Sequence, residues 1–230
     1  MELVRAIKFP IAFDIDRLQA DVQKVLSQEW TDHYNRKDYN GKWTSIALMS
    51  EDGKSDSIFA LNRNKLQDTA ILEQCPYFKS ILNDFPFEKT AVRLLNLTAG
   101  TEIKPHRDYC LGYEDGCFRL HIPIITNSDV VFLLDNKRLI MNEGECWYIN
   151  ANFTHSVVNN GTQDRIHLVI DGLQNEWTDA LFYKEADPEQ FRKPLPEMSE
   201  VEKQRIIEEL NRMNPVLTAT VLQNMENNKP

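Results

Sequence analysis

Short runs of apolar and β-branched residues, each closed by turn residues, fill the middle of the chain. The runs are 91–98, 119–126, 130–134, 145–150, 155–158 and 165–171. Glycine and asparagine separate them, for example at Ala99-Gly100, Asn142-Glu143-Gly144 and Asn159-Asn160-Gly161. Many short strands with this punctuation predict a jelly roll or a related barrel rather than a parallel sheet.

The residues before this region mix helical and extended patterns. Asp14 precedes a stripe of apolar residues at helical spacing, so it is the predicted N-cap of a helix. The predicted elements are strands at 7–13 and 42–49 and helices at 14–28 and 68–82, the second interrupted or restarted at Pro76. We therefore expect residues 1–90 to form a flank of helices and strands on the β core.

The end of the chain has a polar, helical pattern. Ser199-Glu200-Val201-Glu202 is a capping box that predicts a helix through about Met213, and Asn214-Pro215 begins another. Residues 91–183 are thus the expected β core, and 184–230 a C-terminal helical extension. The pattern leaves two expectations open, packing of the extension on the domain or a homodimer through these helices.

Composition and charge narrow the class of protein. At 42% hydrophobic and 27% charged residues, the chain can bury a full core. A net charge of −9 argues against non-specific binding to nucleic acid, which needs a basic face. No apolar run approaches the ~20 residues that span a bilayer, and the first residues lack the apolar core of a signal peptide. We expect a cytoplasmic protein with neither nucleic-acid nor membrane partners.

Two residues near the middle of the chain suggest a metal site. His106 and Asp108 stand at i and i+2, so on an extended backbone both side chains leave the same face. They supply two thirds of a 2-His-1-carboxylate triad, which holds Fe(II) and leaves positions open for a cosubstrate and O2. His155, just ahead of a hydrophobic run, fits as the third ligand. Arg165 opens a later strand and suits a bidentate pair with a keto-acid carboxylate.

The segments around these residues resemble the aspartyl/asparaginyl (and proline) β-hydroxylases, a family of Fe(II)/2-oxoglutarate dioxygenases. The matching segments are 104–108, 118–124, 142–149, 152–156 and 164–171. The resemblance implies a double-stranded β-helix, a cupin-like jelly roll, as the core of a mainly β protein with flanking helices. This agrees with the fold that the strand pattern predicts.

The resemblance also implies roles for individual residues. The implied set is His106, Asp108 and His155 for Fe(II), Arg165 and His121 for 2-oxoglutarate, and Arg119 in support. The implied reaction consumes O2, releases succinate and CO2, and hydroxylates an unactivated C–H bond. Because related halogenases leave the carboxylate position empty for halide, the carboxylate of Asp108 favours hydroxylation.

Alternative interpretations of the same residues are open at this point. His106, Cys110, Cys117 and His121 can be written as a zinc pattern, but residues four apart on a strand are ~13 Å apart and do not converge on one ion. Buried, reduced thiols are the favoured interpretation of the cysteines. Arg119 and His121 also fit a buried structural pair. A non-catalytic cupin-like binding protein and a zinc or manganese cupin enzyme are the competing functions.

The substrate is the part of the function that the sequence describes least. No repeat array or basic face is present to recruit a large partner, so we expect a free or short peptidyl amino acid. Aspartate, asparagine and proline are the first candidates. Arg107, Arg93 and Lys42 are unranked candidates to bind its α-carboxylate.

Overall fold

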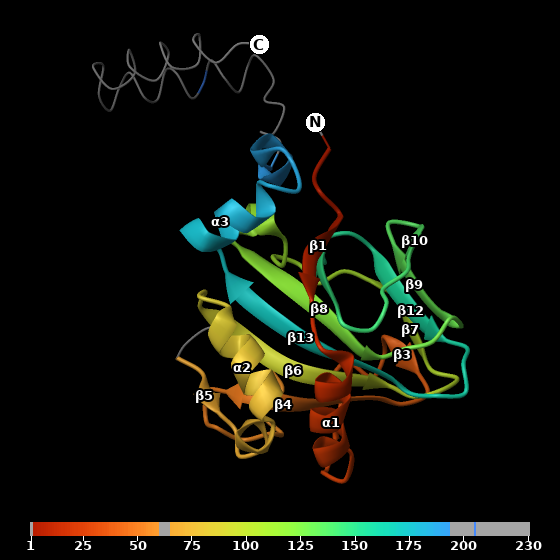
Figure 1. Cartoon of the computed structure of the whole chain (residues 1–230). Helices are drawn as coiled ribbons and strands as arrows, with labels where there is room; N and C mark the ends of the chain where they lie inside the picture. Colours follow the sequence, from red (N-terminus) through yellow and green to blue (C-terminus); the bar gives the residue numbers. More distant parts are fainter. Residues whose placement is uncertain (1, 60–64, 194–204, 206–230) are drawn as a thin grey trace. The chain divides into compact units, whose positions relative to one another are not determined.

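Two antiparallel sheets form the body of the computed structural model, which describes residues 2–59, 65–193 and 205 (Figure 1). The strands are β1 (Ala6–Ala12), β2 (Thr31–Asp32), β3 (Tyr39–Asn40), β4 (Trp43–Ser50), β5 (Gln67–Asp68), β6 (Lys89–Leu97), β7 (Glu102–His106), β8 (Cys117–Ile125), β9 (Val130–Leu134), β10 (Lys137–Leu139), β11 (Glu145–Ile149), β12 (His155–Asn159) and β13 (Arg165–Leu173). The helices are α1 (Ile15–Leu26), α2 (Pro76–Asp84) and α3 (Glu176–Phe182), with the 3-10 turns η1 (Leu72–Gln74), η2 (Tyr113–Asp115) and η3 (Pro188–Phe191).

Successive strands of the core alternate between the two sheets, except that β9 and β10 are neighbours in the smaller one. The larger sheet has the order β1-β11-β8-β13-β6-β4-β2, with β5 paired to β4, and the smaller has the order β10-β9-β12-β7-β3. The inner run β11-β8-β13-β6 of the larger sheet therefore matches the run β10-β9-β12-β7 of the smaller one. This is the topology of a double-stranded β-helix, and the predicted fold is confirmed.

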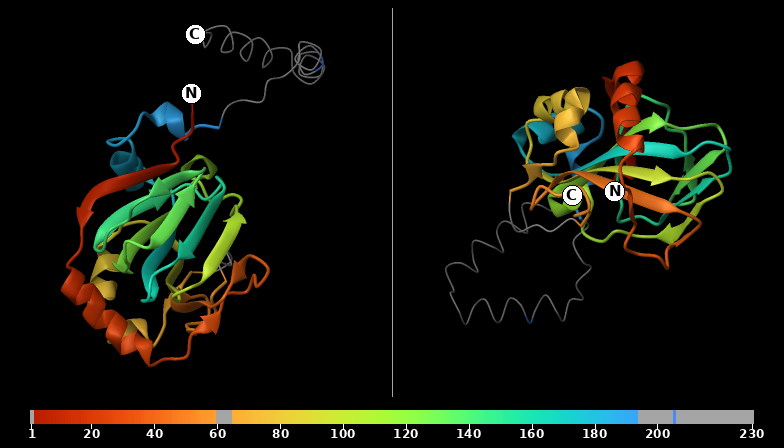
Figure 2. Two further views of the ribbon diagram at one scale, coloured as in Figure 1. Left: turned by 90° about the vertical axis from the view of Figure 1, so that its right-hand side faces the viewer. Right: turned by 90° about the horizontal axis from the view of Figure 1, so that it is seen from below.

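The long strands of the larger sheet present alternate residues to two different cores. On the inner face, Leu95 and Val169 belong to one buried cluster with Phe132 and Val157 of the smaller sheet. On the outer face, residues of opposite parity pack against the helices, which cover this side of the sheet (Figure 2). The two-residue period of a strand thus separates a site-facing interior from a helix-covered exterior.

Helix α1 confirms the first predicted helix. Asp14 is its N-cap, and a carboxylate oxygen of Asp14 accepts a hydrogen bond from the backbone nitrogen of Arg17 at 3.1 Å. The hydrophobic stripe of the helix is buried in the outer core, as its period predicts.

The second predicted helix begins later than expected. The pattern over 68–82 suggested one helix interrupted or restarted at Pro76, and α2 in fact begins at Pro76 and runs to Asp84. Residues Leu72–Gln74 form the separate turn η1. Proline has no backbone N–H to donate and its φ angle suits a first helical turn, so it starts a helix well and continues one poorly.

The residues before the core add strands to the larger sheet. Strand β1 pairs antiparallel with β11, and β4 pairs antiparallel with β6, so the first part of the chain extends both sides of the sheet. None of the helices in the described ranges is long and apolar enough to cross a membrane. The helices predicted from Ser199 onward lie outside the described residues.

Candidate metal centre

Two strands of the smaller sheet bring the predicted metal ligands together. His106 ends β7 and His155 begins β12, and the two residues pair directly across these antiparallel strands. Asp108 lies just past the end of β7, where its backbone nitrogen donates to the carbonyl oxygen of Ala151 at 3.0 Å. Ligand atoms from His106, Asp108 and His155 all lie within 4.8 Å of one another. Over the described ranges, this is the group of side chains placed to hold a metal ion.

The two histidine rings are oriented by equivalent local hydrogen bonds. The Nδ1 atom of His106 lies 2.8 Å from the carbonyl oxygen of Lys104, and that of His155 lies 3.0 Å from the carbonyl oxygen of Phe153. Because a carbonyl only accepts, each Nδ1 carries the proton and each Nε2 has a free lone pair. Burial, helped by the neighbouring His106, lowers the pKa of His155 to about 4, so the ring is neutral as a metal ligand must be.

Asp108 has one oxygen engaged and one facing the histidines. Its Oδ2 atom accepts a hydrogen bond from Nη1 of Arg119 at 2.6 Å, whereas Oδ1 lies 4.0 Å from Nε2 of His106. Burial opposes the charge of this carboxyl group, but the charge and hydrogen bond of Arg119, together with the two neighbouring histidines, outweigh burial and lower the pKa of Asp108. An ionised carboxylate with one free oxygen is thus turned toward the two Nε2 atoms.

All six predicted site residues line one cavity of about 40 Å³ inside the barrel. They are His106, Asp108 and His155, with Arg119, His121 and Arg165. Apolar side chains such as Leu95, Phe132 and Val157 form the rest of its wall. Residues from both sheets contribute, so the cavity depends on the sandwich being closed.

Arg165 is a buried cation without a carboxylate partner in the described part of the chain. It is 3% exposed, and its Nη2 atom donates to Nδ1 of His167 at 2.9 Å. Its Nε atom has no hydrogen-bond partner among the described residues. Burial lowers the pKa of Arg165 to about 9. A guanidinium in this state is suited to an anion that enters the cavity, because unpaired burial of a charge is costly.

His121 lies on the same side of the cavity as Arg165. It is buried, its ring centroid is 5.7 Å from that of His167, and its Nδ1 atom finds no partner in the described ranges. Burial, followed by the charge of Arg165, lowers the pKa of His121 well below its usual value. The neutral ring therefore adds a hydrogen-bonding group beside the guanidinium.

The chain matches the protein-family model described as aspartyl/asparaginyl beta-hydroxylase over residues 11–175. It belongs to that family. It is 28% identical over 166 residues to the L-proline cis-4-hydroxylase of Rhizobium meliloti (strain 1021), covering 70% of this chain and 58% of the relative. It is 30% identical over 169 residues to the L-proline cis-3-hydroxylase 2 of a Streptomyces species, covering 70% and 57%. The chain therefore spans less than two thirds of the length of these relatives.

A solved structure of an oxidoreductase of the 2OG-Fe(II) oxygenase family from Burkholderia pseudomallei is a distant neighbour. It is 12% identical, with a TM-score of 0.49, and the match covers 74% of this chain and 86% of that one.

Arg119 of this family member contacts different groups from those expected. The sequence placed it in support of the cosubstrate residues, but its Nε and Nη2 atoms donate to the two oxygens of Asp171 at 2.7 and 2.9 Å. Arg93 also donates to Asp171, at 2.8 Å. Sequence reasoning missed Asp171, although its position on β13 has the same parity as Arg165 and so faces the interior.

The three candidate cations for the substrate carboxylate and the cysteines differ in how buried they are. Arg107 is exposed and bonds Oγ1 of Thr154 at 2.9 Å, and Lys42 is exposed, so Arg93 is the one of the three candidate cations that is buried. The expectation of buried thiols is wrong for Cys110, which is exposed. The Sγ atom of Cys117 donates to the carbonyl oxygen of Cys110 at 2.8 Å, and neither thiol belongs to a metal group within the described ranges.

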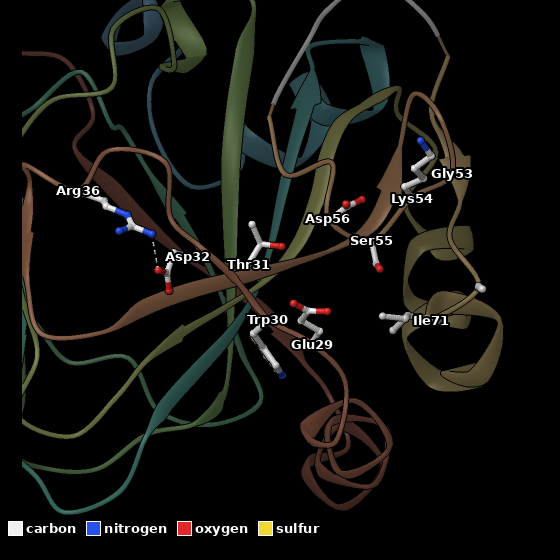
Figure 3. A pocket seen from close by; sticks show the side chains of 11 residues that line it. Glu29, Trp30, Thr31, Asp32, Arg36, Gly53, Lys54, Ser55, Asp56 and Ile71 are labelled. Atoms are coloured by element: carbon white, nitrogen blue, oxygen red, sulfur yellow. Dashed lines mark hydrogen bonds and ion pairs between the residues drawn. The ribbon is translucent and has the colours of Figure 1, made fainter.

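A larger hollow of about 900 Å³ has a different set of lining residues (Figure 3). Its walls come from the residues after α1 and from the loop after β4, and include the ion pair between Asp32 and Arg36 at 2.8 Å. It contains none of the predicted site residues. The larger hollow therefore contains none of the candidate metal ligands or cosubstrate-binding residues.

Proposed function

We propose that this chain is an Fe(II)- and 2-oxoglutarate-dependent hydroxylase that acts on an amino acid. The observation that carries the proposal is the combination of two features in one cavity. Three ligand atoms of a facial triad lie within 4.8 Å, and a buried guanidinium without a carboxylate partner among the described residues lines the same space. A structural site alone has no use for both features.

The residues of the chain divide the work between the metal and the cosubstrate. His106, His155 and Asp108 would hold Fe(II) on one face and leave the opposite positions open. When bound, Fe(II) with 2-oxoglutarate and O2 supplies the oxidative decarboxylation that releases succinate and CO2 and hydroxylates a C–H bond. Arg165 and His121 would hold the distal carboxylate of 2-oxoglutarate, because both present unpartnered nitrogen atoms inside the barrel.

The substrate that we propose is a small free amino acid, with L-proline the first to test. The relatives with the matching sequence are named for L-proline hydroxylation. The cavity lies between the two sheets and is walled by Trp43, Ile103 and Phe132, which suits a compact ligand better than a folded protein. Aspartate and asparagine are the next candidates.

Anaerobic titration tests the metal and cosubstrate part of this proposal. Fe(II) added to the protein with 2-oxoglutarate should produce a weak visible metal-to-ligand charge-transfer band, absent without 2-oxoglutarate. Stoichiometric iron binding with no such band would refute the dioxygenase assignment. It would favour the competing class, a cupin-like binding protein.

Turnover with a substrate panel tests the amino-acid part. Succinate formation is measured with free L-proline, L-aspartate and L-asparagine, with matched short peptides, and with carrier-linked aminoacyl groups. The hydroxylated product is confirmed by a mass gain of one oxygen atom. Turnover restricted to peptide or carrier-linked groups would overturn the free substrate and leave the chemistry standing.

Two further expectations from the sequence stay predictions. A cytoplasmic location is tested by fractionating cells that express the protein at its natural level. A homodimer through residues 184–230 is tested by comparing the solution mass of the whole chain with that of a chain ending at Arg192.

A further inference from the structure

A buried network of alternating charges leads away from the metal ligand Asp108. Arg119 Nη1 holds Oδ2 of Asp108 at 2.6 Å, while the other two donors of the same guanidinium hold Asp171. Arg93 closes the network with a bond of 2.8 Å to Asp171 and another of 3.0 Å to the carbonyl oxygen of Ile58. The side chains become more buried away from the metal, from 32% exposed at Asp108 to 15% at Arg119 and 3% at Asp171.

Strand register fixes the geometry of this network. Arg119 of β8 and Asp171 of β13 are direct partners across antiparallel strands, so their side chains leave the same inner face side by side. A bidentate pair between a guanidinium and a carboxylate fixes the plane and direction of both groups. Once Asp171 occupies Nε and Nη2, Arg119 has Nη1 left to offer Asp108.

This arrangement decides a competition for Asp108. A buried arginine next to a single carboxylate favours the two-pronged contact that takes both of its oxygens. Such a contact at Asp108 would withdraw Oδ1, the oxygen that faces His106 and His155. With Asp171 in place, Arg119 restrains Oδ2 alone and orients Oδ1 toward the metal position.

We infer that Asp171 is a positioning residue that keeps Asp108 available as a one-oxygen metal ligand by occupying the fork of Arg119. Arg93 supports this role by giving Asp171 a second cation, which keeps the carboxylate anchored. The inference rests on the proposed metal site and adds a function to a residue that does not itself touch the metal.

The test uses the whole chain and Co(II) alone as the probe, so it does not depend on turnover. Asp171→Asn should weaken Co(II) binding about tenfold or more, the usual size of a lost outer-shell partner. It should also change the visible absorption of bound Co(II), because Asp108 no longer offers the same oxygen. Asp21→Asn is the matched control, since Asp21 is a buried carboxylate in α1 that binds the backbone nitrogens of Tyr77 and Phe78 instead. This control should lose stability and keep the affinity for Co(II).

A second substitution separates positioning from simple damage. If freed Arg119 captures Asp108, then adding Arg119→Gln to Asp171→Asn should restore part of the Co(II) affinity. A structural role predicts the opposite, a further loss in the double variant. Affinity of Asp171→Asn equal to wild type, or a double variant weaker than Asp171→Asn, overturns the inference.

Two more outcomes complete the design. Should Asp171→Asn not fold, Asp171→Glu keeps the charge and displaces the fork by one methylene; weaker Co(II) binding supports the inference and wild-type binding overturns it. Failure of the wild-type chain to bind Co(II) is a different result. It refutes the proposed metal site itself, and with it the positioning role of Asp171.

Discussion

His106 and His155 lie directly opposite each other on neighbouring antiparallel strands, with their ring centroids 4.2 Å apart. Each ring is held by a hydrogen bond from its own Nδ1 to a carbonyl oxygen two residues back. The orientation of both rings is therefore set by the local backbone and not by a metal. The proposed metal ligands are thus already oriented without a bound cation.

The first prediction concerns these ligands. His106→Ala and His155→Ala should each abolish Fe(II) binding and turnover, because two remaining ligands hold Fe(II) poorly against water. Asp108→Ala should damage both heavily but less completely. Isothermal titration with Fe(II) under argon measures the effect. His33→Phe is the control, because His33 stacks on Trp43 at 3.5 Å and lies outside the triad. Normal iron binding by His155→Ala would show that the triad is misassigned and make His121 the candidate.

The second prediction separates the cosubstrate from the metal. Arg165→Ala should leave iron affinity nearly unchanged and weaken 2-oxoglutarate binding by about 2–5 kcal/mol, which is about 30-fold or more. Arg165→Lys should rescue only part of this loss, since a point charge does not reproduce the planar fork. The charge-transfer band, titrated with 2-oxoglutarate, gives the affinity. An unchanged 2-oxoglutarate requirement in the alanine variant would remove Arg165 from the site.

The triad of candidate metal ligands could be proposed from the sequence because its signal is local. The spacing of His106 and Asp108 needs only two alternate positions of one extended segment, and the position of His155 ahead of a hydrophobic run indicates the start of a strand. The strand pattern was equally informative over 130–134, which the structure has as β9 (Val130–Leu134). The face on which a side chain lies follows from the two-residue period of a strand, and this period does not depend on which strands are its neighbours.

The contacts of Arg119 could not be proposed in the same way. Parity places its side chain inside the barrel, but the choice between Arg165 and Asp171 as a neighbour depends on the register of β8 against β13. That register depends on how both sheets close, and the sequence of a single strand does not determine it. Strand β10 (Lys137–Leu139) was missed for a related reason, because three residues with two exposed cations show no period.

The third prediction tests the packing beneath the site. A methyl group on Gly172 would lie 2.6 Å from two ring carbons of Phe87 and 2.9 Å from Phe118, both of them buried. Gly172→Ala should therefore cost about 1–3 kcal/mol of stability by overpacking. Thermal unfolding measures it, at about 2–4 °C of Tm per kcal/mol for a domain of this size. Adding Phe87→Leu makes room, so the double variant should lose less than the two single losses together. Full additivity would contradict the predicted clash.

The last prediction concerns acid stability and rests on histidines that are buried in the neutral form. Burial lowers the pKa of His33 to about 3 and of His155 to about 4, and it lowers the pKa values of His121 and His167 well below normal. In the unfolded chain all four histidines titrate near 6.5. Below that pH the unfolded state therefore binds more protons than the native state does.

The stability that these histidines confer is therefore fully present above pH 6.5 and is lost as the pH falls toward 4. Between pH 7.5 and 5.5 each should contribute a loss of about 1 kcal/mol. Urea unfolding in the presence of a chelator measures the free energy at each pH. His33→Phe keeps the stack on Trp43 and should reduce the loss by about 1 kcal/mol. Tyr34→Phe alters the same stack without removing a histidine and should keep the wild-type slope. A wild-type stability that stays level over this pH range would mean that the rings accept protons in the folded chain, and their burial would have to be less complete than the packing around Trp43 implies.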